Sequence, residues 1–202
     1  MILKNALAIV ALHSILVSTA GAQDRIRIRT GGKAPDTVRI DETSTPPMIT
    51  VSAGVSVRGA PGSLVDLGGG QYEILSAGNA YYHVKTRSGV DSITVFDGPG
   101  ASRYWLGSGA DDDTVTVYDG PGSDQYKIEG KSGDDVFEVF DDAGDGNDTY
   151  YIKGASGEDL FEIVDGPGDD FYKLRGRSDD VLMFTDFPGD DDFMKLKGLS
   201  LD

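Results

Sequence analysis

An eleven-residue repeat constrains the fold of this chain more than any other feature of its sequence. Six turn residues rich in Gly and Asp alternate with five-residue runs whose second and fourth residues are apolar, such as Tyr126 and Ile128. Alternation with a period of two is typical of a β-strand that buries one face. The successive pairs are Tyr82/Val84, Ile93/Val95, Tyr104/Leu106, Val115/Val117, Tyr126/Ile128, Phe137/Val139, Tyr150/Ile152, Phe161/Ile163, Tyr172/Leu174, Leu182/Phe184 and Met194/Leu196.

Alternate units differ in a regular way. Tyrosine leads every second unit from residue 82 to residue 172, whereas aliphatic residues or Phe lead the others. A coil of two half-turns explains this difference, because like units then stack on the same side. The sequence therefore predicts an all-β fold, a right-handed parallel β-solenoid with two facing parallel sheets and about 22 residues per coil. We expect the tyrosines to line one wall of its core.

The first residues indicate export. A short basic start, Met1 to Lys4, precedes a mostly apolar stretch at residues 6–18 and the small-x-small site Ala20-Gly21-Ala22. We interpret residues 1–22 as a signal peptide and expect a secreted (extracellular) or periplasmic protein with no transmembrane segment. Residues 23–70 read as irregular N-terminal β coils that cap the solenoid, and residues 71–202 as its regular repeats.

Composition excludes several classes of function. The formal charge is −16, from 18 Lys and Arg against 34 Asp and Glu, so we expect no nucleic-acid partner. The chain has no Cys and no nucleophile elbow, zinc-binding helix motif or phosphate loop. We therefore expect that it is not an enzyme. A polysaccharide lyase-like activity is the remaining enzymatic alternative, because those enzymes are also right-handed solenoids that use acidic residues and calcium.

Aspartates recur at the sixth position of the turns. Stacked coils lie about 4.8 Å apart, so each edge of the solenoid would carry a column of mutually repelling carboxylates. A hard cation with oxygen ligands relieves that repulsion, which favours several Ca²⁺ ions over zinc or copper. The alternative is that these residues are ordinary turn aspartates. The candidate metal ligands are Asp91, Asp113, Asp135, Asp159 and Asp180 along one edge, and Asp124, Asp148, Asp170 and Asp192 along the other.

One turn resembles a known calcium-binding repeat. Residues 143–151, Ala-Gly-Asp-Gly-Asn-Asp-Thr-Tyr-Tyr, differ only in the first residue from the hemolysin-type nonapeptide of the RTX family, Gly-Gly-x-Gly-x-Asp-x-(large apolar)-x. The unit here has eleven residues rather than nine, and Pro often fills the third position. The resemblance is to a divergent member of that family and implies a β-roll in which turn carbonyls and sixth-position aspartates bind calcium.

The two outward faces differ in charge. Cations and aromatic rings gather on the tyrosine-side sheet, which is a candidate surface for an anionic glycan or envelope polymer; the alternative is that they serve solubility. The residues of this partner-binding face are Lys85, Arg103, Trp105, Lys127, Tyr151, Lys153, Lys173, Arg175 and Lys195. The opposite sheet has an apolar strip, Phe96, Tyr118, Phe140 and Val164, which we expect to form an oligomer interface or to lie under the N-terminal segment.

These features together predict a secreted calcium-binding β-solenoid that acts as a structural or binding module at or outside the cell envelope. The alternative is a calcium-independent adhesin or anionic-glycan-binding solenoid, whose fold would depend on its aromatic core alone.

Overall fold

The computed structural model describes residues 24–141, 146–185 and 193–201, which form eighteen β-strands in two sheets. Sheet A contains, in spatial order, β17 (Phe193–Lys197), β15 (Phe171–Arg175), β13 (Thr149–Lys153), β11 (Gln125–Ser132), β9 (Arg103–Ala110), β7 (Ala80–Lys85), β1 (Asp24–Arg29) and β4 (Ser56–Arg58). Sheet B contains β18 (Ser200–Leu201), β16 (Val181–Thr185), β14 (Leu160–Val164), β12 (Val136–Phe140), β10 (Thr114–Tyr118), β8 (Ser92–Phe96), β2 (Thr37–Asp41), β3 (Met48–Val51), β6 (Gln71–Ile74) and β5 (Leu64–Gly68). The described ranges contain no helix able to span a membrane.

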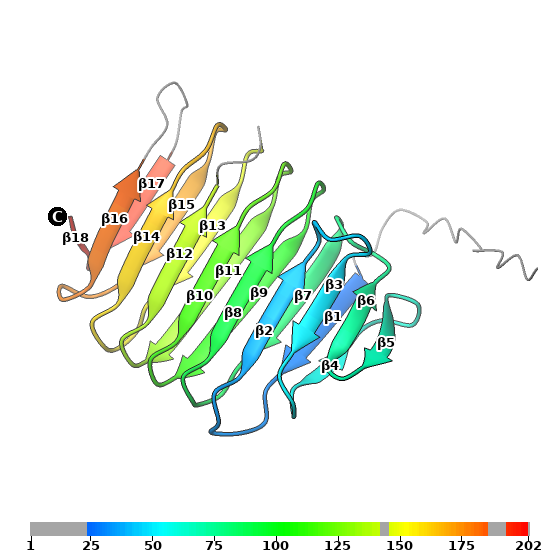
Figure 1. Cartoon of the computed structure of the whole chain (residues 1–202). Helices are drawn as coiled ribbons and strands as arrows, with labels where there is room; N and C mark the ends of the chain where they lie inside the picture. The colour runs from blue at the N-terminus through cyan, green and yellow to red at the C-terminus, as the bar shows by residue number, and fades with distance from the viewer. Residues whose placement is uncertain (1–23, 142–145, 186–192, 202) are drawn as a thin grey trace, which may run out of the picture.

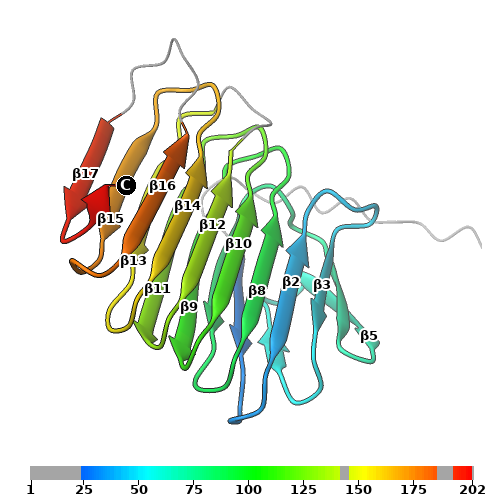
Figure 2. The ribbon, with the colours of Figure 1, turned by 60° about the vertical axis from the view of Figure 1, so that its left-hand side comes forward.

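The chain coils by alternating between the two sheets. From β7 onward, each strand of sheet A is followed by one of sheet B, and each strand pairs in parallel with its equivalent in the next coil. Tyr82, Tyr104 and Tyr126 lie in one register across β7, β9 and β11, 22 residues apart. In Figure 1 the parallel strands of sheet B, β2 and β8 to β16, run upward in front, and those of sheet A run downward behind. The chain advances to the left, so the coil is right-handed; Figure 2 shows the same path from another side. The predicted parallel β-solenoid is confirmed.

Between the sheets lies one continuous apolar core. The five tyrosines that begin alternate units are 0–2% exposed, and their rings stack along sheet A with centroids 4.8–5.1 Å apart. The facing wall carries the pairs of sheet B, including Phe137 and Phe161, whose ring centroids are 5.2 Å apart. Full burial of each such side chain contributes about 1.5–3 kcal/mol. The predicted tyrosine wall is therefore present.

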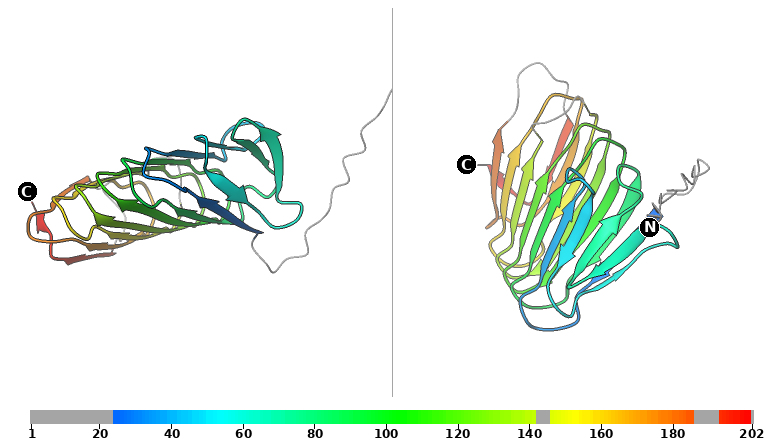
Figure 3. Two further views of the ribbon diagram at one scale, coloured as in Figure 1. Left: turned by 90° about the horizontal axis from the view of Figure 1, so that it is seen from below. Right: turned by 45° about the vertical axis from the view of Figure 1, so that its right-hand side comes forward.

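The N-terminal end of the coil is closed by antiparallel strands. β1 and β2 pair in parallel with β7 and β8 and so form the first coil. Residues 48–74 then pair back on that coil: β4 on β1, and β3, β6 and β5 in succession beside β2 (Figure 3). The cap extends both sheets at their edges, where open backbone groups would otherwise recruit other strands. β6, at residues 71–74, belongs to this antiparallel part, and the parallel coils continue from Ala80.

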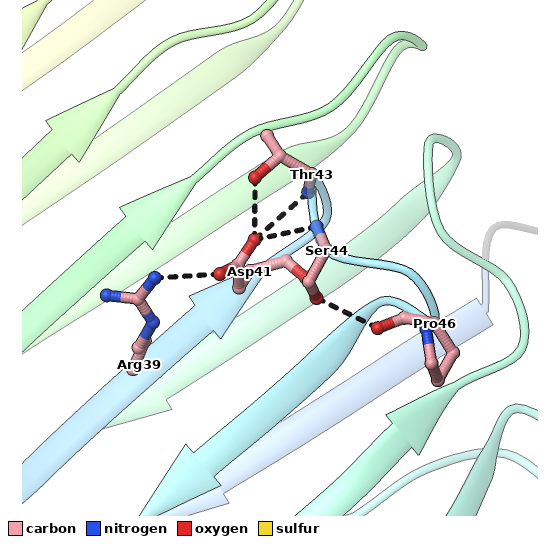
Figure 4. A network of polar contacts seen from close by, with 5 residues as sticks. All are labelled: Arg39, Asp41, Thr43, Ser44 and Pro46. Atoms are coloured by element: carbon pink, nitrogen blue, oxygen red, sulfur yellow. Dashed lines mark hydrogen bonds and ion pairs between the residues drawn. The ribbon is translucent and has the colours of Figure 1, made fainter.

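One carboxylate fixes the turn that leads from the first coil into the cap. Asp41 accepts hydrogen bonds from the backbone N–H of Thr43 and of Ser44 and forms an ion pair with Arg39 at 2.7 Å, while Ser44 donates to the carbonyl oxygen of Pro46 (Figure 4). Burial alone would raise the pKa of Asp41, but the hydrogen bonds from Thr43 and Arg39 outweigh it and the pKa falls below its ordinary value. A carboxylate supplied with this many donors is stable in its charged form.

Candidate metal centre

Along the edge where sheet A turns into sheet B, the sixth-position aspartates join successive coils. Asp91, Asp113, Asp135 and Asp159 are 1–2% exposed. One oxygen of each accepts the backbone N–H of the equivalent residue one coil earlier, at 2.7–3.0 Å, and Asp180 does the same for Asp159. In the described residues these five carboxylates do not meet in a group of three. Their observed role is to hold the backbone of the preceding turn.

The opposite edge repeats this ladder with three of the predicted ligands. The backbone N–H of Ser102 donates to Asp124, that of Asp124 to Asp148, and that of Asp148 to Asp170, each at 2.5 Å. Ser102 occupies the same position one coil earlier and accepts the N–H of Ala80. Asp192, the fourth predicted ligand of this edge, lies outside the described residues.

A second column of carboxylates lies beside the second ladder. Asp97, Asp119, Asp141 and Asp165 each follow a strand of sheet B by one residue and are 0–3% exposed. The backbone N–H of Asp97 donates to the carbonyl oxygen of Tyr118 and so extends the hydrogen bonding of sheet B by one residue. The Asp97 carboxylate accepts a hydrogen bond from the N–H of Gly98. We did not predict these residues as ligands. The signal available was the tetrapeptide Asp-Gly-Pro-Gly, which recurs at residues 97–100, 119–122 and 165–168.

The tyrosine wall supplies hydrogen-bond donors to this column. Tyr104 donates to Asp97 at 2.5 Å, and the hydroxyl of Tyr126 bridges two coils, since it lies 2.8 Å from Asp97 and 2.5 Å from Asp119 and its one proton is shared between them. Tyr150 likewise bridges Asp119 and Asp141. At the two ends of the series, Tyr82 donates a hydrogen bond to Glu42 and Tyr172 donates one to Asp165. Burial raises the pKa of Tyr126 well above its ordinary value, so its hydroxyl keeps its proton and acts as a donor.

The column and the neighbouring Asp124/Asp148/Asp170 ladder together form three overlapping groups of carboxylates. Within each group, one ligand oxygen per residue lies within 4.8 Å of the others. The groups are Asp97/Asp119/Asp124, Asp119/Asp141/Asp148 and Asp141/Asp165/Asp170. Two ligands of one Ca²⁺, each 2.3–2.6 Å from the ion, lie at most about 5 Å apart, so each group has the dimensions of a calcium site. Asp119 and Asp141 are shared between neighbouring groups, each having two oxygens to offer.

These carboxylates cannot all be charged without a counter-charge. Burial raises the pKa of Asp119 to about 8 and that of Asp124 and of Asp141 to about 9, and neighbouring carboxylates add to the effect. Burial also raises the pKa of Asp148 to about 7. At neutral pH the groups therefore hold either protons or cations, and a cation must displace protons to bind.

The donor set fits a hard divalent cation. The second oxygen of Asp124, Oδ2, is buried and receives no hydrogen bond from the described residues, a feature it shares with Asp91, Asp113, Asp135 and Asp159 of the other edge. Such an oxygen is costly to bury unless a proton or a metal ion occupies the position beside it. Three divalent cations would bring six positive charges to the seven carboxylates of the three groups. A groove of about 560 Å³, lined by Glu42, Asp97 and Asp119 among others, adjoins the first group.

The residues of the predicted partner-binding face also come together. All nine lie at outward positions of sheet A, on β7, β9, β11, β13, β15 and β17. On sheet B, the rings of Phe96, Tyr118 and Phe140 stack with centroids 4.7 and 5.2 Å apart. The cap continues sheet B at its edge rather than lying over this strip, and residues 43–47 border the strip at one end.

No protein-family model, curated protein or solved structure matches this chain.

Proposed function

We propose that this protein is a secreted calcium-binding β-solenoid that acts as a structural or binding module at or outside the cell envelope. The observation that carries the proposal is the set of three overlapping carboxylate groups at one edge of the coil. The resemblance of residues 143–151 to the hemolysin-type repeat and the signal-like residues 1–22 support the choice of calcium and of the compartment.

Calcium bound at this edge would couple folding to the surroundings of the protein. Each group takes one carboxylate from one turn of this edge and two from the next turn, so an ion held there ties successive coils together. Ions that bind the folded chain but not the unfolded chain stabilise the fold by mass action. The coil would be weakly stable where calcium is scarce and firmly folded where it is abundant, as it is outside cells.

The first test is a calcium titration of the protein stripped with EDTA, followed by far-UV circular dichroism and thermal melting. We expect the melting temperature to rise with calcium and protons to be released on binding. Terbium is a second probe, because the buried tyrosines beside the carboxylates should sensitise the emission of a bound Tb³⁺ ion.

Two variants give the titration its specificity. Asp119→Asn removes a carboxylate shared by two of the three groups, so we expect loss of most of the terbium signal and of most of the calcium-dependent rise in melting temperature, with the Asp141/Asp165/Asp170 group still able to bind. Asp169→Asn changes an exposed turn aspartate nearby and should leave both intact. If calcium alters neither the melting temperature nor the proton count of the wild-type protein, the column holds protons and the proposal is wrong.

A further inference from the structure

The outward side chains of sheet A form three rows along the coil axis, one per outward strand position. The middle row runs through Arg27, His83, Trp105, Lys127, Tyr151, Lys173 and Lys195. One flanking row runs through Arg29, Lys85, Gly107, Glu129, Lys153, Arg175 and Lys197, and the other through Arg25, Tyr81, Arg103, Gln125, Thr149, Phe171 and Phe193. We call these three rows the basic stripe. Neighbouring strands are about 4.8 Å apart, so Lys127 and Lys173 are separated by roughly 9.6 Å.

Aromatic rings hold the cations of the middle row in place. The rings of His83 and Trp105 stack with centroids 4.4 Å apart and planes 4° apart, and the Lys127 ammonium lies 4.4 Å from the Trp105 ring centroid on the next strand. Lys173 lies 5.1 Å from the ring centroid of Tyr151 in the same way. The faces of Trp105 are therefore occupied by its neighbours, and the ring serves to fix charges rather than to offer a stacking surface.

Few of these positive charges are balanced within the protein. In the described part of the chain, the only ion pair on this face joins Lys127 to Glu129 at 3.2 Å. Burial lowers the pKa of His83, and the charges of Arg25, Arg29, Arg27 and Lys85 lower it further. An acidic protein thus maintains a local cationic field over one sheet, which attracts anions.

We propose that the basic stripe binds a single chain of a linear acidic polysaccharide, laid along the coil axis across β7 to β17. Each ring of a polyuronate carries one carboxylate, so an extended chain presents anions in a row, as the stripe presents cations. The basic stripe lies on a different face from the carboxylate groups, and polysaccharide binding there goes beyond the proposed calcium function.

The width of the stripe selects against other polyanions. A five-residue strand spans roughly 16 Å. Exposed acidic turn residues such as Asp112, Asp134 and Glu158 border it along one edge, and the carboxylate columns follow the other. A nucleic-acid duplex or an anionic membrane would overlap these acids and be repelled. A single-stranded nucleic acid gains much of its affinity by stacking bases on open aromatic faces, and those of Trp105 are taken.

The test measures binding of labelled oligogalacturonate, long enough to span β7 to β17, by fluorescence anisotropy at one fixed calcium concentration. Its methyl ester is the uncharged control, and a single-stranded oligonucleotide of equal length is the rival polyanion. We expect the wild-type protein to bind the acid form in preference to both, with affinity that falls as salt rises. Absence of binding to the acid form, or equal affinity for the oligonucleotide, would overturn the inference.

Two triple variants with the same net charge separate the stripe from general electrostatics. Lys127→Glu, Lys153→Glu and Lys173→Glu together should weaken binding by about 100-fold, since three attractions become repulsions. The matched control reverses Arg87, Lys131 and Arg177, three cations that lie outside the three rows of the stripe, and should bind as the wild type does. Equal losses in the two triples would contradict a dedicated site. The calcium-dependent melting shift of both triples is measured in parallel, so a failure of the calcium proposal is recognised separately.

Discussion

The carboxylate oxygen Oδ1 of Asp135 accepts the backbone N–H of Asp113 at 3.0 Å, from one coil to the coil before it. The two residues occupy the same position of the repeat, so the hydrogen bond reproduces itself at each step of this edge. The ladder gives a turn aspartate a role that requires neither a metal ion nor solvent: it satisfies a buried backbone donor that the sheet ladder does not reach.

Replacing Asp135 tests this role. Asp135→Ala leaves the N–H of Asp113 buried without an acceptor and should lower the free energy of unfolding by about 1–3 kcal/mol. Asp135→Asn keeps an acceptor oxygen in place and should retain most of that stability. Chemical denaturation of the two variants and the wild type measures the free energy of unfolding of each. Equal decreases in the two variants would show that the hydrogen bond to Asp113 does not stabilise the fold.

The buried carboxyl groups of this same aspartate ladder predict an unusual dependence of the free energy of unfolding on pH in metal-free buffer. Burial raises the pKa of Asp113 to about 7 and that of Asp135 to about 8, from 3.8 in an unperturbed side chain. Between these limits the folded chain binds more protons than the unfolded chain, so stability decreases as pH rises from about 4 to about 8. Each such group contributes a slope of at most about 1.4 kcal/mol per pH unit. Denaturation in EDTA across this range measures the slope, which Asp135→Asn should reduce. Stability that is flat or increases with pH would be inconsistent with protonated carboxyls.

A tyrosine hydroxyl can be removed from the core without creating a cavity. Tyr126→Phe deprives Asp97 and Asp119 of a shared donor, and we expect the free energy of unfolding to fall by about 1–3 kcal/mol. Tyr118→Phe is the matched control, because that ring lies on the outer face of sheet B and is 40% exposed. Thermal melting of both variants provides the comparison. A loss no greater for Tyr126 than for Tyr118 would mean that the inner hydroxyl contributes nothing.

The spacing of Tyr82, Tyr104 and Tyr126 was sufficient to predict the coil, its two sheets and its tyrosine wall, because side-chain period and repeat length are geometric properties of a stacked fold. The inward direction of Asp97 and Asp119 was not predictable in the same way. Aspartate before Gly-Pro is a common turn residue, and its inward orientation here depends on a tyrosine hydroxyl supplied seven residues later by the opposite sheet.

The cap shows a second limit of the sequence. Alternating residues such as Val55 and Val57, or Tyr72 and Ile74, indicate strands near these positions. Alternation does not encode whether a strand pairs in parallel or antiparallel, and here the direction reverses because short turns lead the chain back over the edges of the first coil.

One glycine of the turns is required by its backbone conformation. Gly133 has φ of 118°, and a Cβ atom there would lie 2.3 Å from the carbonyl oxygen of Asp111 in the preceding coil. The left-handed conformation alone costs an L residue about 1–2 kcal/mol, and the clash adds to it. We expect Gly133→Ala to lower the melting temperature markedly. Gly107→Ala is the control, since its Cβ would meet only ordinary contacts, the nearest being Val84 at 3.7 Å. Similar melting temperatures for the two variants would refute the steric argument.

Because the aspartate ladder repeats itself at each coil, the fold does not fix the number of coils. Residues 103–124 constitute one coil of 22 residues, and the parallel pairing of residues 103–107 and 114–118 with the neighbouring strands is repeated by residues 125–129 and 136–140 one step later. Chains with more or fewer coils would keep the same cap and the same core. The carboxylate groups and the basic stripe would lengthen together, in fixed proportion, so gain or loss of one coil would tune the multivalency of both surfaces in a single step.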